Sequence, residues 1–313
     1  MISFRYHVVT VAAVFLALAI GVVLGAGPLR GGGDRTLVQQ ARSERDARSG
    51  LQSRIDAMQA QNRFTDAFAA TVAPGLVGNT LRGHAVTVVQ LPSARQADVA
   101  ASKELVGEAG GTVAGTVRVG AKLVDAGSKQ LVDELGSQLE GRANDVSVPA
   151  DAGPYERIGA LVGRAVGART AGGAPVDAPA TSILSALGTA KLLSTQGRMT
   201  RRGDLVLLVA GPGRGNADAR RGAASIVSTL AQAVDGATRG VVLAGPPASA
   251  RAGGEVRALR DDVAAAKDVS TVDALGRTAG EVVTVLALAG QAGGRAGHYG
   301  AVDAADGAMP GAH

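Results

Sequence analysis

The sequence contains no cysteine and no tryptophan, and among its 313 residues there are only four phenylalanines and three tyrosines. Without cysteine the chain has no disulfide framework, no thiolate metal site and no cysteine nucleophile. Proteins that stack nucleic-acid bases on aromatic platforms need Phe, Tyr or Trp, and membrane β-barrels carry aromatic girdles at both rims. The scarcity of aromatic residues argues against both classes, so we expect no nucleic-acid partner.

Neither sign of charge dominates the sequence. The formal net charge is +5, from 32 Lys and Arg against 27 Asp and Glu. An excess this small is typical of an ordinary solvated surface and does not indicate a site for a polyanion. The length suffices for one large domain or two smaller ones beside any membrane segment.

One long apolar run is present, from Val8 to Gly27, and Thr10 is its only polar side chain. As a helix with ~1.5 Å rise per residue it spans roughly 30 Å, the thickness of the hydrocarbon core of a bilayer. A helix also satisfies its own backbone polar groups, which lipid cannot do. The run therefore predicts a transmembrane helix within a signal-anchor segment, residues 1–29. Its candidate membrane-facing side chains are Val8, Phe15, Leu16, Leu18, Ile20 and Leu24.

Two other interpretations of this run are open. Arg5 forms a short basic start, and the small residues around Gly25 suit a cleavage site, as in a secretory signal peptide. The run is longer than the ~7–15 apolar residues of a typical signal peptide, which favours an uncleaved anchor. The second alternative is a buried core helix, and the lack of an interrupting charge makes it the weakest. Anchor and signal peptide both direct the chain to a membrane.

Residues 30–75 form a charge-rich segment with helical periodicity. We expect Pro28 and the glycines at 31–33 to end the first helix and to form a flexible joint. We expect Pro74 to end the helical segment. Glu44 and Arg48 interrupt the apolar seam. The seam positions are Leu37, Ala41, Leu51, Ile55, Met58, Asn62, Ala69 and Val72. This spacing predicts a coiled-coil-like stalk through which copies of the chain form a homo-oligomer; the alternative is a single amphipathic helix packed on the next domain.

From residue 76 to about 290, strand and helix patterns alternate. The expected strands are Ala85–Pro92, Gly111–Gly120, a short Asn144–Pro149, Asp204–Pro212 and Gly240–Pro247. The expected helices are Ala94–Gly110, Lys129–Glu140, Tyr155–Arg169, Thr181–Leu193, Ala217–Val234, Glu255–Ala266 and Thr278–Ala289. Strands separated by helices predict a mostly parallel sheet with helices on both faces. The fold class is therefore α/β, preceded by the transmembrane helix and the stalk.

The loop after the strand Asp204–Pro212 contains Gly211, Gly213 and Gly215. Ligands of parallel sheets bind at the carboxyl ends of the strands, and glycines there let a phosphate approach the backbone. The spacing G-x-G-x-G matches neither the dinucleotide fingerprint nor the phosphate-binding loop with its lysine. Turn-forming glycines are the favoured interpretation.

An enzymatic site is not predicted. A hydrolase needs a nucleophile, a base and a group that orients the base. His84 is the only histidine within the α/β region, and no G-x-S-x-G elbow supplies a serine to pair with it. The pair Asp261 and Asp262 is most simply a solvated helix face. We expect a protein that is not an enzyme and has no cofactor.

The segment 291–313 is rich in Gly and Ala, and we expect a flexible tail that can dock through Tyr299. It contains His298, Met309 and His313, whose imidazole and thioether groups suit copper ions. These three residues are the candidate metal ligands. The alternative is a mobile tail in which they occur incidentally.

Both ends of the sequence carry a family resemblance. The opening MISFRYHVVTVAAVFLALAIGVVLGAGPL and the segment GQAGGRAGHYG at Gly290–Gly300 are similar to the actinobacterial copper transporter family, of the mycobacterial copper transport protein B type. The resemblance implies an outer-membrane protein of the cell envelope that takes part in copper efflux and copper homeostasis. Copper would then be the transported ion, and the large domain would lie outside the cytoplasm.

The residues themselves limit how such a protein transports copper. One span per chain cannot enclose a pore, and Val8–Gly27 lacks the polar lining usual in intramembrane pathways. Conduction would require several copies around one path. The alternative function is a structural or interaction module that recruits envelope partners through its stalk and α/β domain. Charge leaves the orientation open, because Arg5 lies before the span and Arg30 and Arg35 lie after it.

Overall fold

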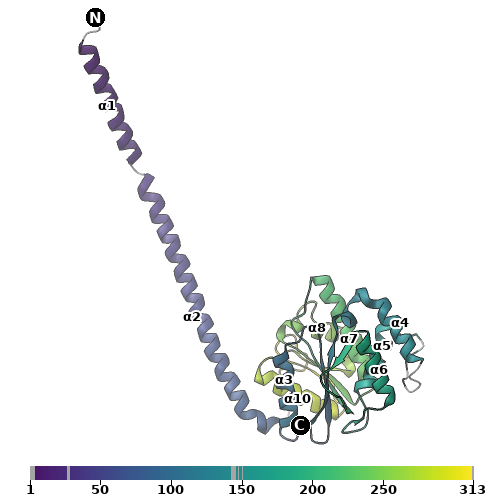
Figure 1. The fold of residues 1–313 in the computed structure, drawn as a ribbon. Coiled ribbons are helices and arrows are strands. Elements are labelled where there is room, and N and C mark those ends of the chain that lie inside the picture. Colours follow the sequence, from purple (N-terminus) through teal and green to yellow (C-terminus); the bar gives the residue numbers. More distant parts are fainter. Residues whose placement is uncertain (1–3, 27–28, 142–145, 147, 150, 312–313) are drawn as a thin grey trace. The chain divides into compact units, whose positions relative to one another are not determined.

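The computed structural model describes residues 4–26, 29–141, 146, 148–149 and 151–311. The chain divides into two compact units, residues 1–65 and 66–313, and each is described by itself. Figure 1 follows the chain from the N-terminal helices to the sheet.

Two helices form the N-terminal part of the chain, α1 (Phe4–Ala26) and α2 (Leu29–Val77). The first helix ends at Ala26, before Pro28 as expected, but the expected joint at Gly31–Gly33 and the expected end of the next helix at Pro74 are wrong, because these residues lie inside α2. Proline inside a helix removes one backbone hydrogen bond. The last turn of α2 persists because Gly78 N–H donates to Pro74 O at 3.0 Å, and because Ala73 and Val77 are buried in the core of the second unit.

The seam of α2 has two parts. Leu51, Ile55 and Met58 are exposed, each by 46% or more of its surface. Further along the helix, within the second unit, Ala69 and Ala73 are buried. The C-terminal end of α2 is thus an amphipathic helix packed on the α/β domain, whereas the apolar positions 51–58 have no cover within one chain.

The second unit is built from short strands and the helices between them. The strands are β1 (Ala85–Gln90), β2 (Thr112–Val119), β3 (Ala174–Pro175), β4 (Leu193–Thr195), β5 (Arg201–Arg202), β6 (Leu205–Val209), β7 (Gly240–Ala244), β8 (Ser270–Val272) and β9 (His298–Tyr299). The helices are α3 (Gln96–Glu108), α4 (Lys129–Glu140), α5 (Pro154–Val166), α6 (Ala178–Thr189), α7 (Ala217–Asp235), α8 (Glu255–Asp261), α9 (Val263–Asp268) and α10 (Thr278–Ala292).

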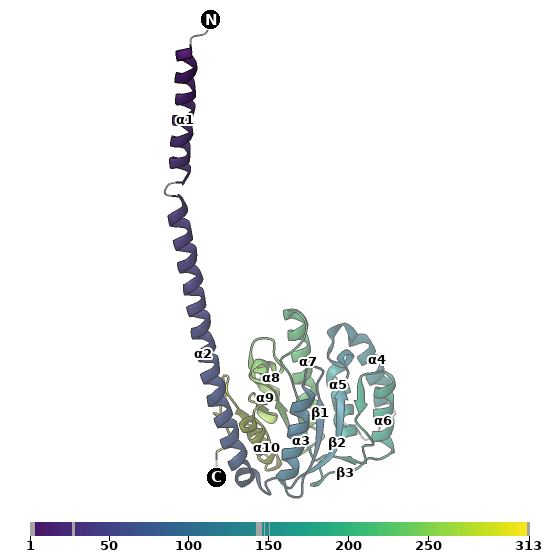
Figure 2. The same cartoon turned by 60° about the vertical axis from the view of Figure 1, so that its left-hand side comes forward.

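Seven strands form the main sheet in the order β4-β2-β1-β6-β7-β8-β9, and β3 pairs with β5 separately. The main sheet is parallel except for β4, which runs antiparallel to β2. Figures 1 and 2 show helices on both faces of this sheet. The predicted α/β class is confirmed.

The central strands separate two apolar cores. Along β6, Leu205 and Leu207 point to one core, together with side chains of α3, α10 and the end of α2. Val206 and Leu208 belong to the other core, with α5 and α7. Successive side chains of a strand point to opposite faces, so a strand covered on both faces is apolar throughout. This is why β6 and β7 stand out in the sequence.

Two predicted helices have different bounds in the structure. The helix expected over Thr181–Leu193 ends at Thr189, and Lys191 adopts a left-handed conformation with φ of 58°, after which Leu193 begins β4. The helix expected over Glu255–Ala266 is divided at Asp262, whose carboxylate accepts hydrogen bonds from the first amides of α9. The predicted strand Asn144–Pro149 falls largely outside the described residues.

Candidate functional site

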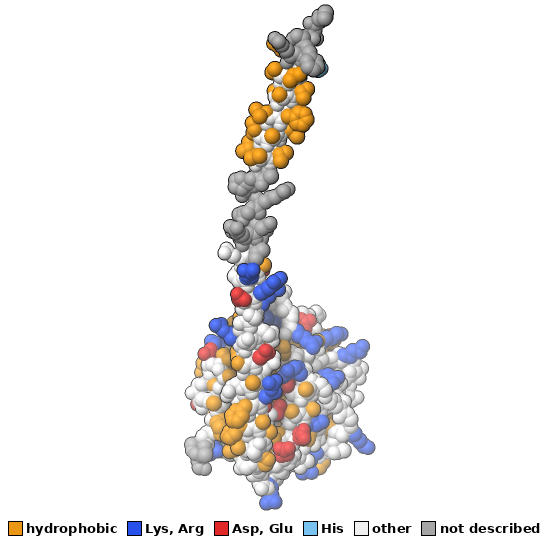
Figure 3. Space-filling model, turned by 90° about the vertical axis from the view of Figure 1, so that its left-hand side faces the viewer, with side chains coloured by type: hydrophobic (Ala, Val, Ile, Leu, Met, Phe, Trp, Pro, Cys, Tyr) orange, Lys and Arg blue, Asp and Glu red, His pale blue; other side chains and the backbone are white. Residues whose placement is uncertain are grey.

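The described side chains of α1 form an exposed apolar surface. Residues Tyr6–Gly25 have a mean hydropathy of 2.8 and none of the span is buried within the chain. The candidate membrane-facing residues Val8, Phe15, Leu16, Leu18, Ile20 and Leu24 are each more than half exposed. Figure 3 shows hydrophobic side chains along this helix. The described helix is thus not buried within its own unit, and by length and composition α1 can cross a membrane.

The single polar side chain of the run is satisfied within the helix. The hydroxyl of Thr10 donates to the backbone oxygen of Tyr6 at 2.7 Å. A hydroxyl bonded in this way does not need water or a partner helix. Along the described part of the run, α1 therefore presents hydrocarbon to its surroundings.

β1 and β6 are neighbours in the sheet, and the next strands beside them, β2 and β7, lie on opposite sides of this pair. Ligands of such sheets bind in the crevice at the carboxyl ends of the two central strands. Here Ser93, which follows β1, is bonded to Gly211, which follows β6. The Ser93 hydroxyl accepts a hydrogen bond from Gly211 N–H at 3.1 Å and donates to Glu255 Oε1 at 3.1 Å. A Cβ atom at Gly211 would lie 1.9 Å from the backbone oxygen of Ser93. Gly211 thus allows close packing, and its N–H is occupied by the protein itself.

The glycines that follow have a turn function. Gly213 and Gly215 have φ of 77° and 87°, values that favour glycine, and they lead into α7. These φ values agree with the interpretation of Gly213 and Gly215 as turn-forming. Glu255 is buried, and burial raises the pKa of its carboxyl while the hydrogen bond from Ser93 opposes that rise. The other carboxyl oxygen, Oε2, is buried and has no hydrogen-bond partner among the described residues.

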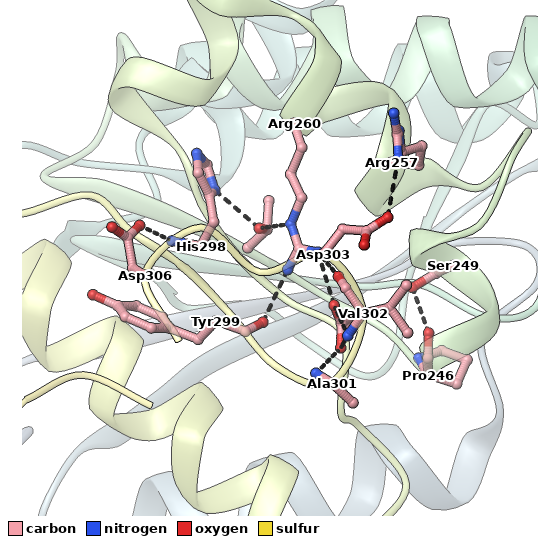
Figure 4. Close-up of polar contacts among 12 residues, drawn as sticks. Pro246, Ser249, Arg257, Arg260, His298, Tyr299, Ala301, Val302, Asp303 and Asp306 are labelled. Atoms are coloured by element: carbon pink, nitrogen blue, oxygen red, sulfur yellow. Dashed lines mark hydrogen bonds and ion pairs between the residues drawn. The ribbon is translucent and has the colours of Figure 1, made fainter. Parts of the chain in front are cut away.

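Next to this crevice, a loop after β9 is fixed by a buried ion pair (Figure 4). Arg260 Nη1 lies 2.7 Å from Asp273 Oδ2, and the exposed fractions of the two side chains are 9% and 0%. Arg260 also donates to the backbone oxygens of Tyr299 at 2.9 Å and Val302 at 2.7 Å. Asp273 accepts from the N–H groups of Ala301 and Val302. Part of the segment predicted as a flexible tail is therefore held on the sheet.

The three predicted metal ligands lie in different settings. His298 is in β9, with Nδ1 3.0 Å from the Thr271 hydroxyl oxygen. Burial, and next the charge of Arg260, lower its pKa. Met309 is partly exposed and lines a hollow of about 580 Å³ together with Tyr299. His313 lies outside the described residues, so the set stays a prediction.

A further pair was not predicted from the sequence. The Nδ1 atom of His84 lies 2.6 Å from Oδ2 of Asp204, whose side chain is fully buried. His84 immediately precedes β1 and Asp204 immediately precedes β6, and these strands are parallel neighbours. The sequence does contain a signal for this pair. His84 and Asp204 each stand at the start of an expected strand, and neighbouring parallel strands begin at the same edge of a sheet. Within the described part of the chain, no group of three or more His, Asp or Glu side chains is arranged to hold a metal ion.

Comparison with known proteins relates the whole chain to one group. Residues 1–310 match the family model described as copper transport outer membrane protein, MctB. The chain belongs to this family. It is 33% identical over 307 residues to the copper transporter MctB of Mycobacterium tuberculosis strain H37Rv, with 96% of each chain covered, and the Mycobacterium bovis protein matches equally. The Mycobacterium leprae protein is 38% identical over 133 residues, 40% of each chain. The expected family is confirmed over essentially the full length.

Proposed function

We propose that this protein is a single-pass, membrane-anchored protein of the cell envelope that contributes to copper transport and homeostasis. The observation that carries the proposal is the family match over residues 1–310, together with relatives named copper transporters. The apolar helix α1 supports retention in a membrane. We infer that the α/β domain lies on the side away from the cytoplasm, because the matching family is described as an outer membrane protein. The transport role of the family favours a function without catalysis.

We further propose that copies of the chain assemble through α2. A path for copper enclosed by one apolar helix is impossible, so conduction needs several copies of α1. The exposed side chains of Leu51, Ile55 and Met58 follow one another at intervals of four and three residues, the spacing of a coiled-coil seam. Pairing along this seam would bury them and bring the anchors of the copies together.

Deletion of the gene tests the transport role. Under copper stress we expect the deletion strain to accumulate intracellular copper and to grow less well than its parent. A reintroduced wild-type gene should restore both, and a gene encoding an unrelated anchored protein serves as the matched control. Unchanged copper content and growth in the deletion strain would refute the transport role.

Protease treatment of intact cells tests the topology. With an epitope after residue 311, we expect protease to remove the epitope from intact cells, and the untreated protein to retain the mass of the uncleaved chain. Protection of the epitope would place the domain inside. A mass lower by about the first 27 residues would show that the apolar run is a cleaved signal peptide.

A second candidate function is a structural or interaction module that recruits envelope partners. The hydrogen bond from Gly211 N–H to the Ser93 hydroxyl favours it, because this amide is already occupied at the edge where ligands of related sheets bind. Cross-linking in living cells followed by purification tests this function. Recovery of no envelope protein from a strain with normal levels of the chain would remove the support for it.

A further inference from the structure

The two outer edges of the main sheet differ in how they are covered. At one edge the chain itself protects β9, because Asp306 N–H donates to His298 O at 3.0 Å and Gly300 N–H donates to Gly307 O at 3.0 Å. At the other edge, β4 pairs with β2 on one side and has no strand on its other side within the described part of the chain. An edge strand without cover is a template for the pairing of another strand.

The backbone groups on the outer side of β4 have no partner. Gln196 N–H donates to Thr116 O at 2.8 Å, so the backbone at this position is directed toward β2. In an antiparallel ladder successive residues alternate between the two sides. The N–H and C=O groups of Leu193 and Thr195 therefore point away from β2, and no other described residue forms a hydrogen bond with them. Folded proteins pair nearly all backbone groups that are sheltered from water, and Leu193 is only 3% exposed.

A hollow of about 690 Å³ lies along this free edge. All of β4 lines it, and another wall is formed by α6 through Thr181, Leu184, Ser185 and Gly188. Gly188 has no side chain to fill this space, and a Cβ atom there would lie 3.9 Å from Leu193 O. Figure 2 shows α6 at this end of the sheet. Neighbouring strands lie about 4.8 Å apart, so an added strand would run in the hollow between β4 and α6.

The surroundings of the hollow are positively charged. The charged residues of the segment 178–202 are Lys191, Arg198, Arg201 and Arg202, all of them basic. Lys191 and Arg198 are exposed, and Arg198 lines the hollow. The carboxylate of Asp177, which precedes the segment, is engaged by Arg202 at 3.1 Å. A basic surface of this kind attracts acidic segments and repels basic ones.

We propose that the free edge of β4 binds an extended, acidic peptide segment of an envelope partner, which adds a strand to the sheet and places alternate side chains in the hollow beside α6. Main-chain hydrogen bonds to Leu193 and Thr195 provide affinity, and the hollow selects the side chains. The inference goes beyond copper transport. It rests on the second candidate function, the recruitment of envelope partners, and adds the chemistry of the partner.

A second copy of the chain is the other source of a strand for this edge. In an antiparallel pair of two β4 strands, Lys191 and Arg198 of both copies would gather along the same short edge. Like charges on neighbouring strands oppose pairing, whereas an acidic segment has no such repulsion. The charge therefore favours a different chain as the occupant.

Two substitutions block the edge in different ways. Thr195→Pro removes the outward N–H of residue 195 and keeps the hydrogen bonds to β2, and edge strands tolerate proline. Gly188→Leu fills the hollow from a helix position at which leucine is favourable. Ser182→Leu is the matched control, because Ser182 is exposed on α6 and is not among the described residues that line the hollow.

The probe is a fluorescent pool of short peptides in which Glu alternates with Val, Ile or Thr, added to the full chain in detergent. We expect saturable binding by fluorescence polarisation. T195P should weaken it by about 2–10-fold, which corresponds to one net hydrogen bond, G188L should abolish it, and S182L should leave it unchanged. A pool of the same charge with Pro at the alternate positions cannot pair as a strand and should not bind.

Hydrogen exchange on the unsubstituted chain identifies the site without any variant. When the alternating pool binds, the amides of Leu193 and Thr195 should exchange more slowly. No binding of this pool, equal binding of the proline pool, or unchanged exchange at the two amides would overturn the proposal. A lower molecular mass of T195P than of the wild type, measured by light scattering, would assign the edge to a second copy and would also overturn it.

The outcome is separable from the functions proposed above. If cross-linking recovers the same envelope partners from the wild type and from T195P, the recruiting function stands without this site. If the peptides bind as expected but cross-linking recovers no partner, the site stands and the recruiting function fails. The copper content of the deletion strain depends on neither result.

Discussion

Asp235, at the end of α7, shows how burial changes a single carboxyl. Its pKa is raised from the ordinary 3.8 to about 6, mainly by burial and next by the charge of Asp268, while Arg169 and the Val241 amide oppose the shift. Because the folded state binds this proton more tightly than the unfolded state, stability is lost as pH rises from about 4 through 6. At pH 7 the folded protein holds an unfavourable, partly buried charge.

We expect Asp235→Asn to stabilise the protein at pH 7. About two pKa units correspond to about 3 kcal/mol, which solvent screening at this partly exposed side chain reduces to about 1–2 kcal/mol. The free energy of unfolding, measured with urea between pH 3.5 and 7.5, should differ between the proteins at pH 7 and converge at the acid end. A variant less stable than the wild type at pH 7 would contradict this account.

Single residues were the hardest features to predict. The sequence drew attention to His84, but Asp204 is 120 positions away and its partnership depends on β1 and β6 being neighbours. Ser93 and Gly211 are likewise 118 positions apart. A sequence pattern does not show which strands are neighbours or which of their residues lie side by side. Such contacts therefore become visible only in the structure.

At the scale of elements, the loop after β9 depends on one guanidinium. Removing one partner of a buried ion pair leaves the other charge uncompensated, which costs about 3–5 kcal/mol. We expect Arg260→Ala to destabilise the second unit by this amount and to speed hydrogen exchange at Ala301 and Val302, whose amides are bonded to Asp273.

Arg257→Ala is the matched control, because this arginine is exposed and pairs with the exposed side chains of Asp261 and Asp303. Exposed ion pairs contribute little, so its melting temperature and amide exchange should match those of the wild type. Equal exchange in the Arg260 and Arg257 variants would show that the loop is held by other contacts.

Elements with a strong periodic pattern were predicted well, and short ones were not. The fully apolar runs of β6 and β7 and the helix α7 have the expected positions. β4 and β9 have only three and two residues, too few to show any period. Their place in the sheet depends on tertiary contacts, such as the hydrogen bonds that hold Tyr299.

At the scale of the whole molecule, the exposed seam of α2 predicts self-association. We expect the full chain in detergent to be oligomeric by light scattering, and the combined change of Leu51, Ile55 and Met58 to Gln to give monomers, because three apolar side chains are lost from the interface. Leu131→Gln on α4, also exposed, is the control and should leave the mass unchanged. A monomeric wild type, or an oligomeric triple variant, would contradict stalk pairing.

The position of β9 has a consequence for the order of folding during synthesis. The helix α1 is made first and the edge strand β9 is made late, so the domain cannot close until residues 298–299 have been synthesised. Until residues 298–302 have emerged, Asp273 and Arg260 lack the backbone partners that cover them. A pause in synthesis before that point would leave an unfinished domain in which the charge pair of Arg260 and Asp273 is open to water.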